Sequence, residues 1–177
     1  RGVRSGNPAG TKLFDLDWDI CVILDACRYD FYEVYATQAE LQGDIQPRQS
    51  IASSTPQFLK LNFTHETHPD TVYVTGNPQY HMHREMVGDT FHAVINVWRK
   101  GWDEDLQTVP PRVVVETLTS ANERYPNKRL LAHFVQPHVP FISEQGRSDF
   151  PISMDESTGE SWNAARKFWP SIRRGKR

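Results

Sequence analysis

The chain has 177 residues, and its 20 lysines and arginines against 22 aspartates and glutamates give a formal net charge of −2. This near balance argues against a broadly basic surface, so no nucleic-acid partner is expected. At 38% hydrophobic and 24% charged residues the composition is that of a globular protein. No apolar run approaches the roughly 20 residues of a membrane span, so no transmembrane segment is expected.

The predicted elements begin with a leader, a strand and a helix. Residues 1–12 are rich in glycine, serine and basic side chains, so we expect a loose leader before a domain that covers residues 13–177. The apolar run 20–24 is typical of a strand buried in a parallel sheet, with both of its faces covered. Apolar residues at helical spacing over 29–41 predict a helix, with Gly43 as its stop.

The same alternation of strands and helices continues along the chain. Thr55 followed by Pro56 predicts the start of a short helix, with Thr55 as the N-cap and Pro56 at the first helical position. Strands are predicted at residues 71–75, 91–98 and 130–135, and a further helix is predicted to start at the proline pair 110–111. This pattern predicts an α/β fold with a mainly parallel sheet flanked by helices.

Three polar clusters fall at the ends of predicted strands or in the turns that follow them. They are Asp25 with Arg28, the hydroxyl-rich turn at residues 53–55, and His133 with His138. In open parallel sheets the functional residues gather at the carboxyl ends of the strands. The three clusters are therefore expected at one edge of the sheet.

Asp25 and Thr55 carry the clearest chemistry. A carboxylate at a strand end is a good ligand for a divalent cation. The plainer alternative is that Asp25 caps the following helix or pairs with Arg28. At a helix N-terminus the Thr55 hydroxyl would meet backbone amides that stabilise an anion, and a metal ion is its simplest activator. The alternative there is an ordinary Thr-Pro cap, with Ser54 and Ser53 as fallback nucleophiles.

The histidines supply further candidates. His138 lies in a Pro-His-Val-Pro segment whose prolines fix the backbone, so its imidazole is suited to protonate a leaving group, hold a substrate oxygen or bind a metal. His133, inside the predicted strand, is by itself more typical of a packed core histidine. Two short pairs have spacings that suit zinc but lack a matching second pair: His65 with His68, and His81 with His83.

Spacing argues against several other phosphate chemistries. A haloacid-dehalogenase-type site needs a second Asp two positions after the strand-ending Asp25, and this chain has Cys27 there. A cysteine phosphatase needs a cysteine and an arginine separated by five residues, and neither cysteine of this chain has an arginine at that spacing. The sequence also lacks a glycine-rich phosphate loop and a Gly-x-Ser-x-Gly elbow.

In order and approximate spacing, the three clusters resemble the sulfatase-like proteins of the alkaline phosphatase superfamily. Residues 17–30 resemble that family's opening strand, in which an Asp is followed shortly by Arg-x-Asp. The segment 54–56 resembles its nucleophile turn, and residues 133–141 resemble its His-x-Pro-Tyr/Phe element. The resemblance covers roughly residues 14–145 and implies an alkaline-phosphatase-like α/β fold.

The resemblance implies a role for each matched residue. Asp25 would be a metal ligand, Thr55 would be both nucleophile and metal ligand, and His138 would contact the transferred group or the leaving oxygen. The residues expected to bind substrate are Ser54, Arg28 and His133, and Arg28 would also support the Asp25 loop. The implied cofactor is a divalent metal ion: zinc, manganese, magnesium or calcium. The implied substrate is a phosphate ester or sulfate ester, with glycan-linked and lipid-linked esters included.

Two departures from the family pattern shape the expected function. No Cys-x-Pro-x-Arg motif is present, so phosphate chemistry is favoured over sulfate-ester hydrolysis. No Asp-His pair occurs in the chain, although the family completes its metal site with one. We therefore expect the N-terminal portion of a metal-dependent hydrolase or transferase for phosphate esters. The alternative is a non-catalytic module that binds a glycan or phosphate. The compartment stays open, with a soluble cytoplasmic chain as the default expectation.

Overall fold

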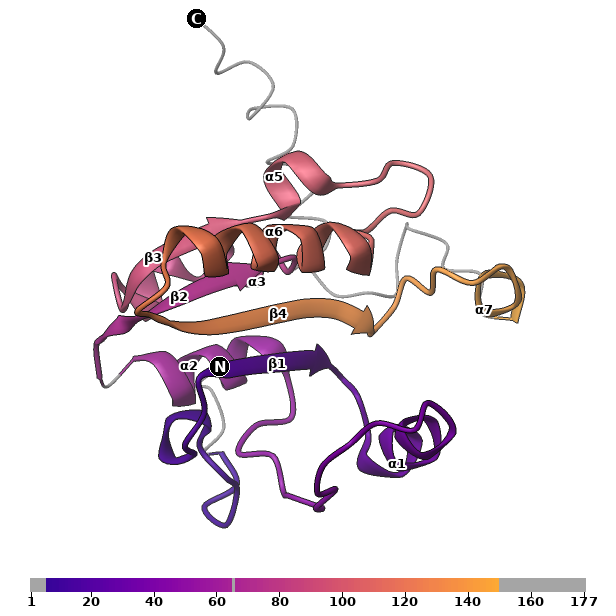
Figure 1. Cartoon of the computed structure of the whole chain (residues 1–177), viewed down its shortest axis with the longest axis horizontal. Coiled ribbons are helices and arrows are strands. Elements are labelled where there is room, and N and C mark those ends of the chain that lie inside the picture. Colours follow the sequence, from indigo (N-terminus) through magenta and orange to yellow (C-terminus); the bar gives the residue numbers. More distant parts are fainter. Residues whose placement is uncertain (1–5, 65, 150–177) are drawn as a thin grey trace, which may run out of the picture.

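The structure is a computed structural model that describes residues 6–64 and 66–149. It has an α/β fold in which a four-stranded parallel sheet lies between helices (Figure 1). The strand order is β1-β4-β2-β3. The strands are β1 (Ile20–Asp25), β2 (His68–Thr75), β3 (Phe91–Asn96) and β4 (Arg129–Pro137). The predicted fold class is thus confirmed.

The helices are mostly short and connect the strands. Those before β3 are the 3₁₀ helix η1 (Leu13–Asp15), α1 (Tyr29–Gln38), α2 (Thr55–Phe63), α3 (Gln79–Met82) and α4 (Arg84–Val87). Those after it are α5 (Trp98–Gly101), α6 (Pro111–Arg124) and α7 (Glu144–Asp149). Within the described ranges, no helix combines the length and apolar character needed to cross a membrane.

The two faces of the sheet pack against different helices, because side chains alternate along each strand. On one face, Val72 and Val74 of β2 pack with Val114 of α6. On the other face, Tyr73 of β2 packs with Leu59 and with other residues of α2. Figure 1 shows α6 and α2 on opposite sides of the sheet. Residues on the α2 face that lie near the strand ends therefore point toward the start of α2.

Strand β1 differs from the prediction of a strand with both faces covered. Its side chains at Ile20, Val22 and Leu24 are 54%, 50% and 37% exposed, while Cys21 and Ile23 are partly buried. The reason is its place at the edge of the sheet, because α6 packs on β4 and β2 and leaves the same face of β1 open. The prediction of full burial is wrong for this face.

The predicted helix boundaries are close to the observed ones, with small shifts. Ser54 is the N-cap of α2 and Thr55 is its first residue, so the helix begins one residue earlier than predicted. Helix α1 ends at Gln38, so Gly43, with φ of 124°, lies in the loop beyond it rather than at its stop. The segment predicted as a strand over 91–98 divides into β3 and the start of α5.

The part of the leader that the structure describes is attached to the segment before α2. The Asn7 amide donates to the Ile51 carbonyl at 2.9 Å, and the Thr11 amide donates to the Gln49 carbonyl at 2.9 Å. These bonds hold the chain that leads into the turn at residues 53–55. Residues 1–5 and 150–177 of the predicted leader and domain lie outside the described residues.

Candidate functional site

A cavity of about 550 Å³ lies at the carboxyl-terminal edge of the sheet. Polar side chains from β1, β4, the start of α2 and the segment after β2 line it: Asp25, Ser53, Ser54, Thr55, Asn77, Gln79, His133 and His138. The strand register brings them together, because His133 on β4 pairs with Ile23 of β1 on one side and with Thr75 of β2 on the other. The three strands therefore end near the same place.

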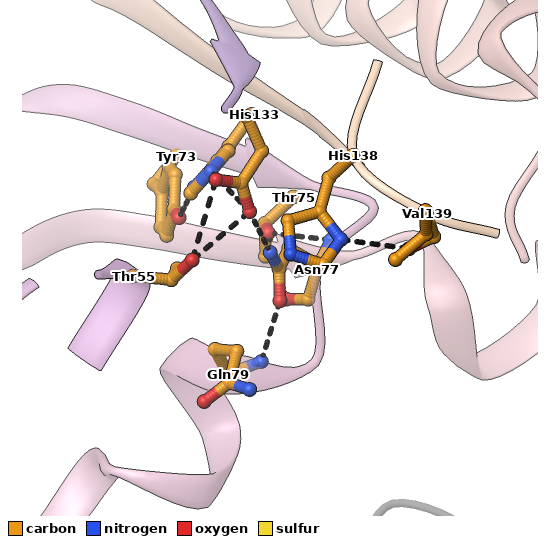
Figure 2. A network of polar contacts seen from close by, with 9 residues as sticks. Thr55, Tyr73, Thr75, Asn77, Gln79, His133, His138 and Val139 are labelled. Carbon is orange, nitrogen blue, oxygen red and sulfur yellow. Dashed lines mark hydrogen bonds and ion pairs between the residues drawn. The ribbon is translucent and has the colours of Figure 1, made fainter. Parts of the chain in front are cut away.

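Asp25 is the centre of the polar network in this cavity. The Thr55 hydroxyl donates to its carboxylate, at 3.0 Å from Oδ2 and 3.3 Å from Oδ1. The Asn77 side-chain amide donates to Oδ2 at 2.8 Å, and His133 Nε2 lies 3.9 Å from the same oxygen. Figure 2 shows Thr55, Asn77 and His133 gathered around this point. The carboxylate predicted to bind a metal is thus held in a defined orientation.

Thr55 combines a reactive group with a favourable position. It is the first residue of a nine-residue helix, with Ser54 as the N-cap and proline in the second position. Just before the helix, the Ser53 amide donates to the Gln57 side chain at 2.8 Å, which fixes the turn. A helix N-terminus presents unpaired backbone amides and a partial positive charge, both of which stabilise an anion. The Thr55 hydroxyl therefore lies on the wall of the cavity, next to a helix N-terminus that favours negative charge.

His133 is buried, with 2% of its surface exposed, and lies between a hydroxyl and a carboxylate. Its Nδ1 is 2.7 Å from the Tyr73 hydroxyl. Burial lowers the pKa of His133 to about 4, and the nearby charge of Asp25 only partly opposes this shift. The imidazole is therefore neutral at physiological pH.

Asn77 is a site residue that the sequence interpretation missed. Its side-chain amide is held in one orientation, because Oδ1 accepts from the Gln79 backbone amide at 2.9 Å while Nδ2 donates to Asp25. Its backbone amide donates to Thr75 Oγ1 at 3.0 Å, and that hydroxyl donates to the Asn77 carbonyl at 2.9 Å. The available signal is its place between a glycine and a proline in the turn that follows β2, close to the strand end as Asp25 is.

His138 closes the site from the end of β4. Its backbone amide donates to the Asp25 carbonyl at 3.0 Å, which ties the two strand ends together. Its Nδ1 lies 2.7 Å from the Val139 carbonyl (Figure 2). Because a carbonyl only accepts, Nδ1 carries a proton, and proton exchange with a substrate would use Nε2. This arrangement suits the predicted contact with a leaving oxygen.

Arg28 is the predicted site residue that the structure does not bring to the cavity. Its guanidinium pairs with Asp30, with Nε at 3.0 Å and Nη2 at 2.6 Å from the carboxylate oxygens, and both side chains are exposed. The guanidinium also lies over the Phe31 ring. Its substrate-binding role stays a prediction, while Asp25, Ser54, Thr55, His133 and His138 all line the cavity.

The histidine pairs considered for zinc do not form clusters in the described residues. His68 stacks on the Phe14 ring with centroids 3.4 Å apart, and His65 lies outside the described residues. His81 lies against Trp98, and His83 hydrogen-bonds to Gln79 at 3.1 Å. Over residues 6–64 and 66–149, no group of three or more His, Cys, Asp or Glu side chains is placed to hold a metal.

The donors around Asp25 nevertheless fit a divalent cation in part. Magnesium is often held by one or two carboxylates, with waters and substrate phosphate oxygens as its other ligands. Asp25 and Thr55 offer a carboxylate and a hydroxyl within 3.0 Å of each other, on the wall of an open cavity. These two residues are the ones that the sequence predicted as metal ligands.

No protein-family model, no curated protein and no solved structure matches this chain.

Proposed function

We propose that this chain carries the nucleophile half of a metal-dependent hydrolase or transferase that acts on phosphate esters. Thr55 is the nucleophile, and Asp25 with Thr55 contributes to the metal site. The relation to sulfatase-like proteins of the alkaline phosphatase superfamily belongs to this proposal and rests on the three motifs. The substrate is a phosphate ester, because the chain lacks the cysteine motif on which sulfate-ester hydrolysis in that family depends.

The observation that carries the proposal is the contact between Thr55 and Asp25. The hydroxyl at the start of α2 lies 3.0 Å from a carboxylate at the end of β1, and both line the same cavity. A hydroxyl needs a base or a metal ion to become a nucleophile, and this carboxylate serves either requirement. An ordinary helix cap would instead direct the threonine hydroxyl to a backbone amide of its own helix.

The proposed reaction has two balanced steps. Thr55 Oγ1 attacks phosphorus, its proton passes to the Asp25 carboxylate, and the P–O bond to the leaving group breaks with its electron pair on the leaving oxygen. Protonated His138 gives a proton to that oxygen, which leaves as an alcohol. Water or an acceptor hydroxyl then attacks the phosphorylated Thr55, loses its proton to neutral His138, and Thr55 leaves with the proton from Asp25.

The charge that develops on the phosphoryl oxygens needs stabilisation throughout. The backbone amides at the start of α2 supply part of it at the position where the phosphoryl group would lie. A divalent cation, when bound, would neutralise phosphoryl charge and lower the pKa of the hydroxyl. Asn77 keeps the Asp25 carboxylate in place through its 2.8 Å hydrogen bond.

Substitution of Thr55 tests the proposal. Thr55→Ala removes the nucleophile and its hydrogen bond to Asp25, so we expect turnover of an aryl phosphate ester to fall at least about 10³-fold. Thr55→Ser keeps a hydroxyl and should retain measurable turnover. Steady-state kinetics with added divalent cations, and unfolding curves for each variant, measure the effect separately from folding.

Ser54→Ala tests the neighbouring hydroxyl as the alternative nucleophile, because Ser54 lines the same cavity and makes no side-chain cap hydrogen bond. It should leave turnover within about tenfold of the wild type. Activity that survives in Thr55→Ala but is lost in Ser54→Ala would move the nucleophile to Ser54. Phosphate binding without turnover in the wild type would favour the non-catalytic binding module.

A further inference from the structure

We propose that the C-terminal segment of this chain, residues 161–177, docks on an exposed apolar face of helix α1. Phe31, Val34 and Tyr35 form this face, which we call the α1 face. None of the three side chains lines the cavity, so the inference goes beyond the proposed function and does not depend on it.

The α1 face stays open in the part of the chain that the structure describes. Phe31, Val34 and Tyr35 are 56%, 52% and 64% exposed. They lie three and four positions apart, so they project from the same side of the helix. Ala36 is the only residue of α1 that is buried among the described residues, and it lies on the opposite side from Phe31 and Val34. The helix therefore contacts the described structure through one side and exposes apolar side chains on the other.

A helix of this length needs a packing partner. Helices as short as the ten residues of α1 are marginal in water, and most helical stability in proteins comes from packing of an apolar face. The side-chain contacts along α1 are instead exposed and polar: Arg28 pairs with Asp30, and the Tyr29 hydroxyl donates to Glu33 at 2.7 Å. Exposed contacts of this kind contribute little stability. A contiguous apolar surface on such a helix therefore marks an interaction site.

The charge around the α1 face determines which kind of partner fits it. Residues 29–44 contain four acidic side chains and no basic one. Asp30 lies one turn before Val34 on the same side of the helix, so an acidic group borders the face. Arg28 pairs with Asp30, which leaves the other three acidic side chains to attract positive charge. A partner that combines apolar side chains with positive charge is therefore complementary to this surface.

The chain itself contains a segment with the complementary composition. Residues 161–177, which lie outside the described residues, contain six basic side chains and no acidic one. The same segment has four large apolar side chains: Trp162, Phe168, Trp169 and Ile172. It therefore offers the apolar surface and the positive charge that the α1 face calls for, within the same molecule.

The chain is long enough to bring this segment to α1. His138 donates its backbone amide to the Asp25 carbonyl, and α1 begins four residues after Asp25. Asp149, the last described residue, lies eleven residues after His138, and Figure 1 shows α1 and α7 beyond the paired ends of β1 and β4. Residues 150–160 can span roughly 35 Å when extended, against about 15 Å for the length of α1. Tethering also gives the segment a high effective concentration at this surface.

Hydrogen exchange of the full chain, read by mass spectrometry, tests the contact from both sides. Val34→Arg replaces an apolar side chain with one that repels the basic segment, so we expect exchange over residues 162–172 to accelerate at least about fivefold. Arginine is a better helix former than valine, so α1 should stay helical in this variant. In the reverse direction, Trp162→Ala combined with Trp169→Ala should accelerate exchange over residues 29–38 at least about fivefold.

Val115→Arg is the matched control for the change on α1. Val115 lies within helix α6 and is 50% exposed, so the same side chain is replaced at nearly the same exposure on a different helix. This variant should leave exchange over residues 29–38 and 162–172 unchanged.

Two results would overturn the inference. One is exchange over residues 29–38 that is as fast in the wild type as in the double tryptophan variant, because the α1 face would then be uncovered in the isolated chain. The other is protection of α1 that increases with protein concentration, together with a dimer in sedimentation, because the α1 face would then be covered by a second copy of the chain.

Discussion

His133 connects burial, charge and stability at the scale of a single residue. Its pKa falls from the ordinary 6.5 to about 4 in the folded protein, chiefly because burial disfavours the charged imidazole. Between these values the unfolded chain binds a proton that the folded chain does not. The free energy of unfolding is therefore highest above about pH 6.5 and decreases as the pH falls toward 4, by up to roughly 3 kcal/mol.

Urea unfolding of the metal-free protein from pH 7 to pH 4 measures this dependence. Burial also lowers the pKa values of His68, His81 and His83, so the wild-type curve contains several contributions. His133→Gln removes one of them and should lose stability less steeply as the pH decreases. Parallel pH curves for the two proteins would show that His133 is not held neutral by burial.

The sequence predicted most residues of the site but not all of its contacts. Asp25, Thr55 and His138 were predicted from strand ends, a helix start and a proline-flanked loop, which are local signals. The donation from Asn77 to Asp25 spans 52 positions in the chain, and no local pattern encodes it. The same holds for the Tyr73 and His133 bond, which depends on adjacent strands in register.

At the scale of elements, β1 shows how the position of a strand in the sheet overrides its composition. A continuous apolar run is typical of a strand covered on both faces, yet Val22 is 50% exposed while Val74 on β2 is fully buried. The two residues have the same side chain and lie on the face of the sheet that α6 covers only over β2 and β4. Sequence composition alone does not tell an edge strand from a central one.

A matched pair of truncations tests this difference. Val74→Ala leaves a cavity in the core and should lower the free energy of unfolding by about 2 kcal/mol, whereas Val22→Ala should cost less than about 1 kcal/mol. Chemical denaturation of both variants under the same conditions measures the two losses. Equal losses would indicate that the open face of β1 is covered in solution.

The start of α2 illustrates how small errors in an element matter at a site. If Thr55 were the N-cap, as predicted, it would have extended backbone angles and its hydroxyl would be engaged with its own helix. As the first helical residue it reaches Asp25 instead, and Ser54 takes the extended conformation. Helix boundaries depend on tertiary contacts such as this one, so propensity places them only approximately.

At the scale of the whole molecule, the fold explains why distant motifs meet. The order β1-β4-β2-β3 places β4 between the first two strands of the chain, so His133 and His138 lie beside Asp25 although more than 100 positions separate them. The strand–helix alternation predicted the α/β class, because each element has a local signal. The strand order and register depend on packing between distant segments, and so the cavity itself was not predictable in detail.

Trapping the covalent intermediate tests whether Thr55 forms a bond to phosphorus. The full chain is incubated with an aryl phosphate ester and zinc, quenched in acid, digested and analysed by mass spectrometry. We expect one added phosphoryl group on Thr55, and none at this position in Thr55→Ala. Phosphate on Ser54, or steady turnover with Thr55 unmodified at every quench time, would contradict it.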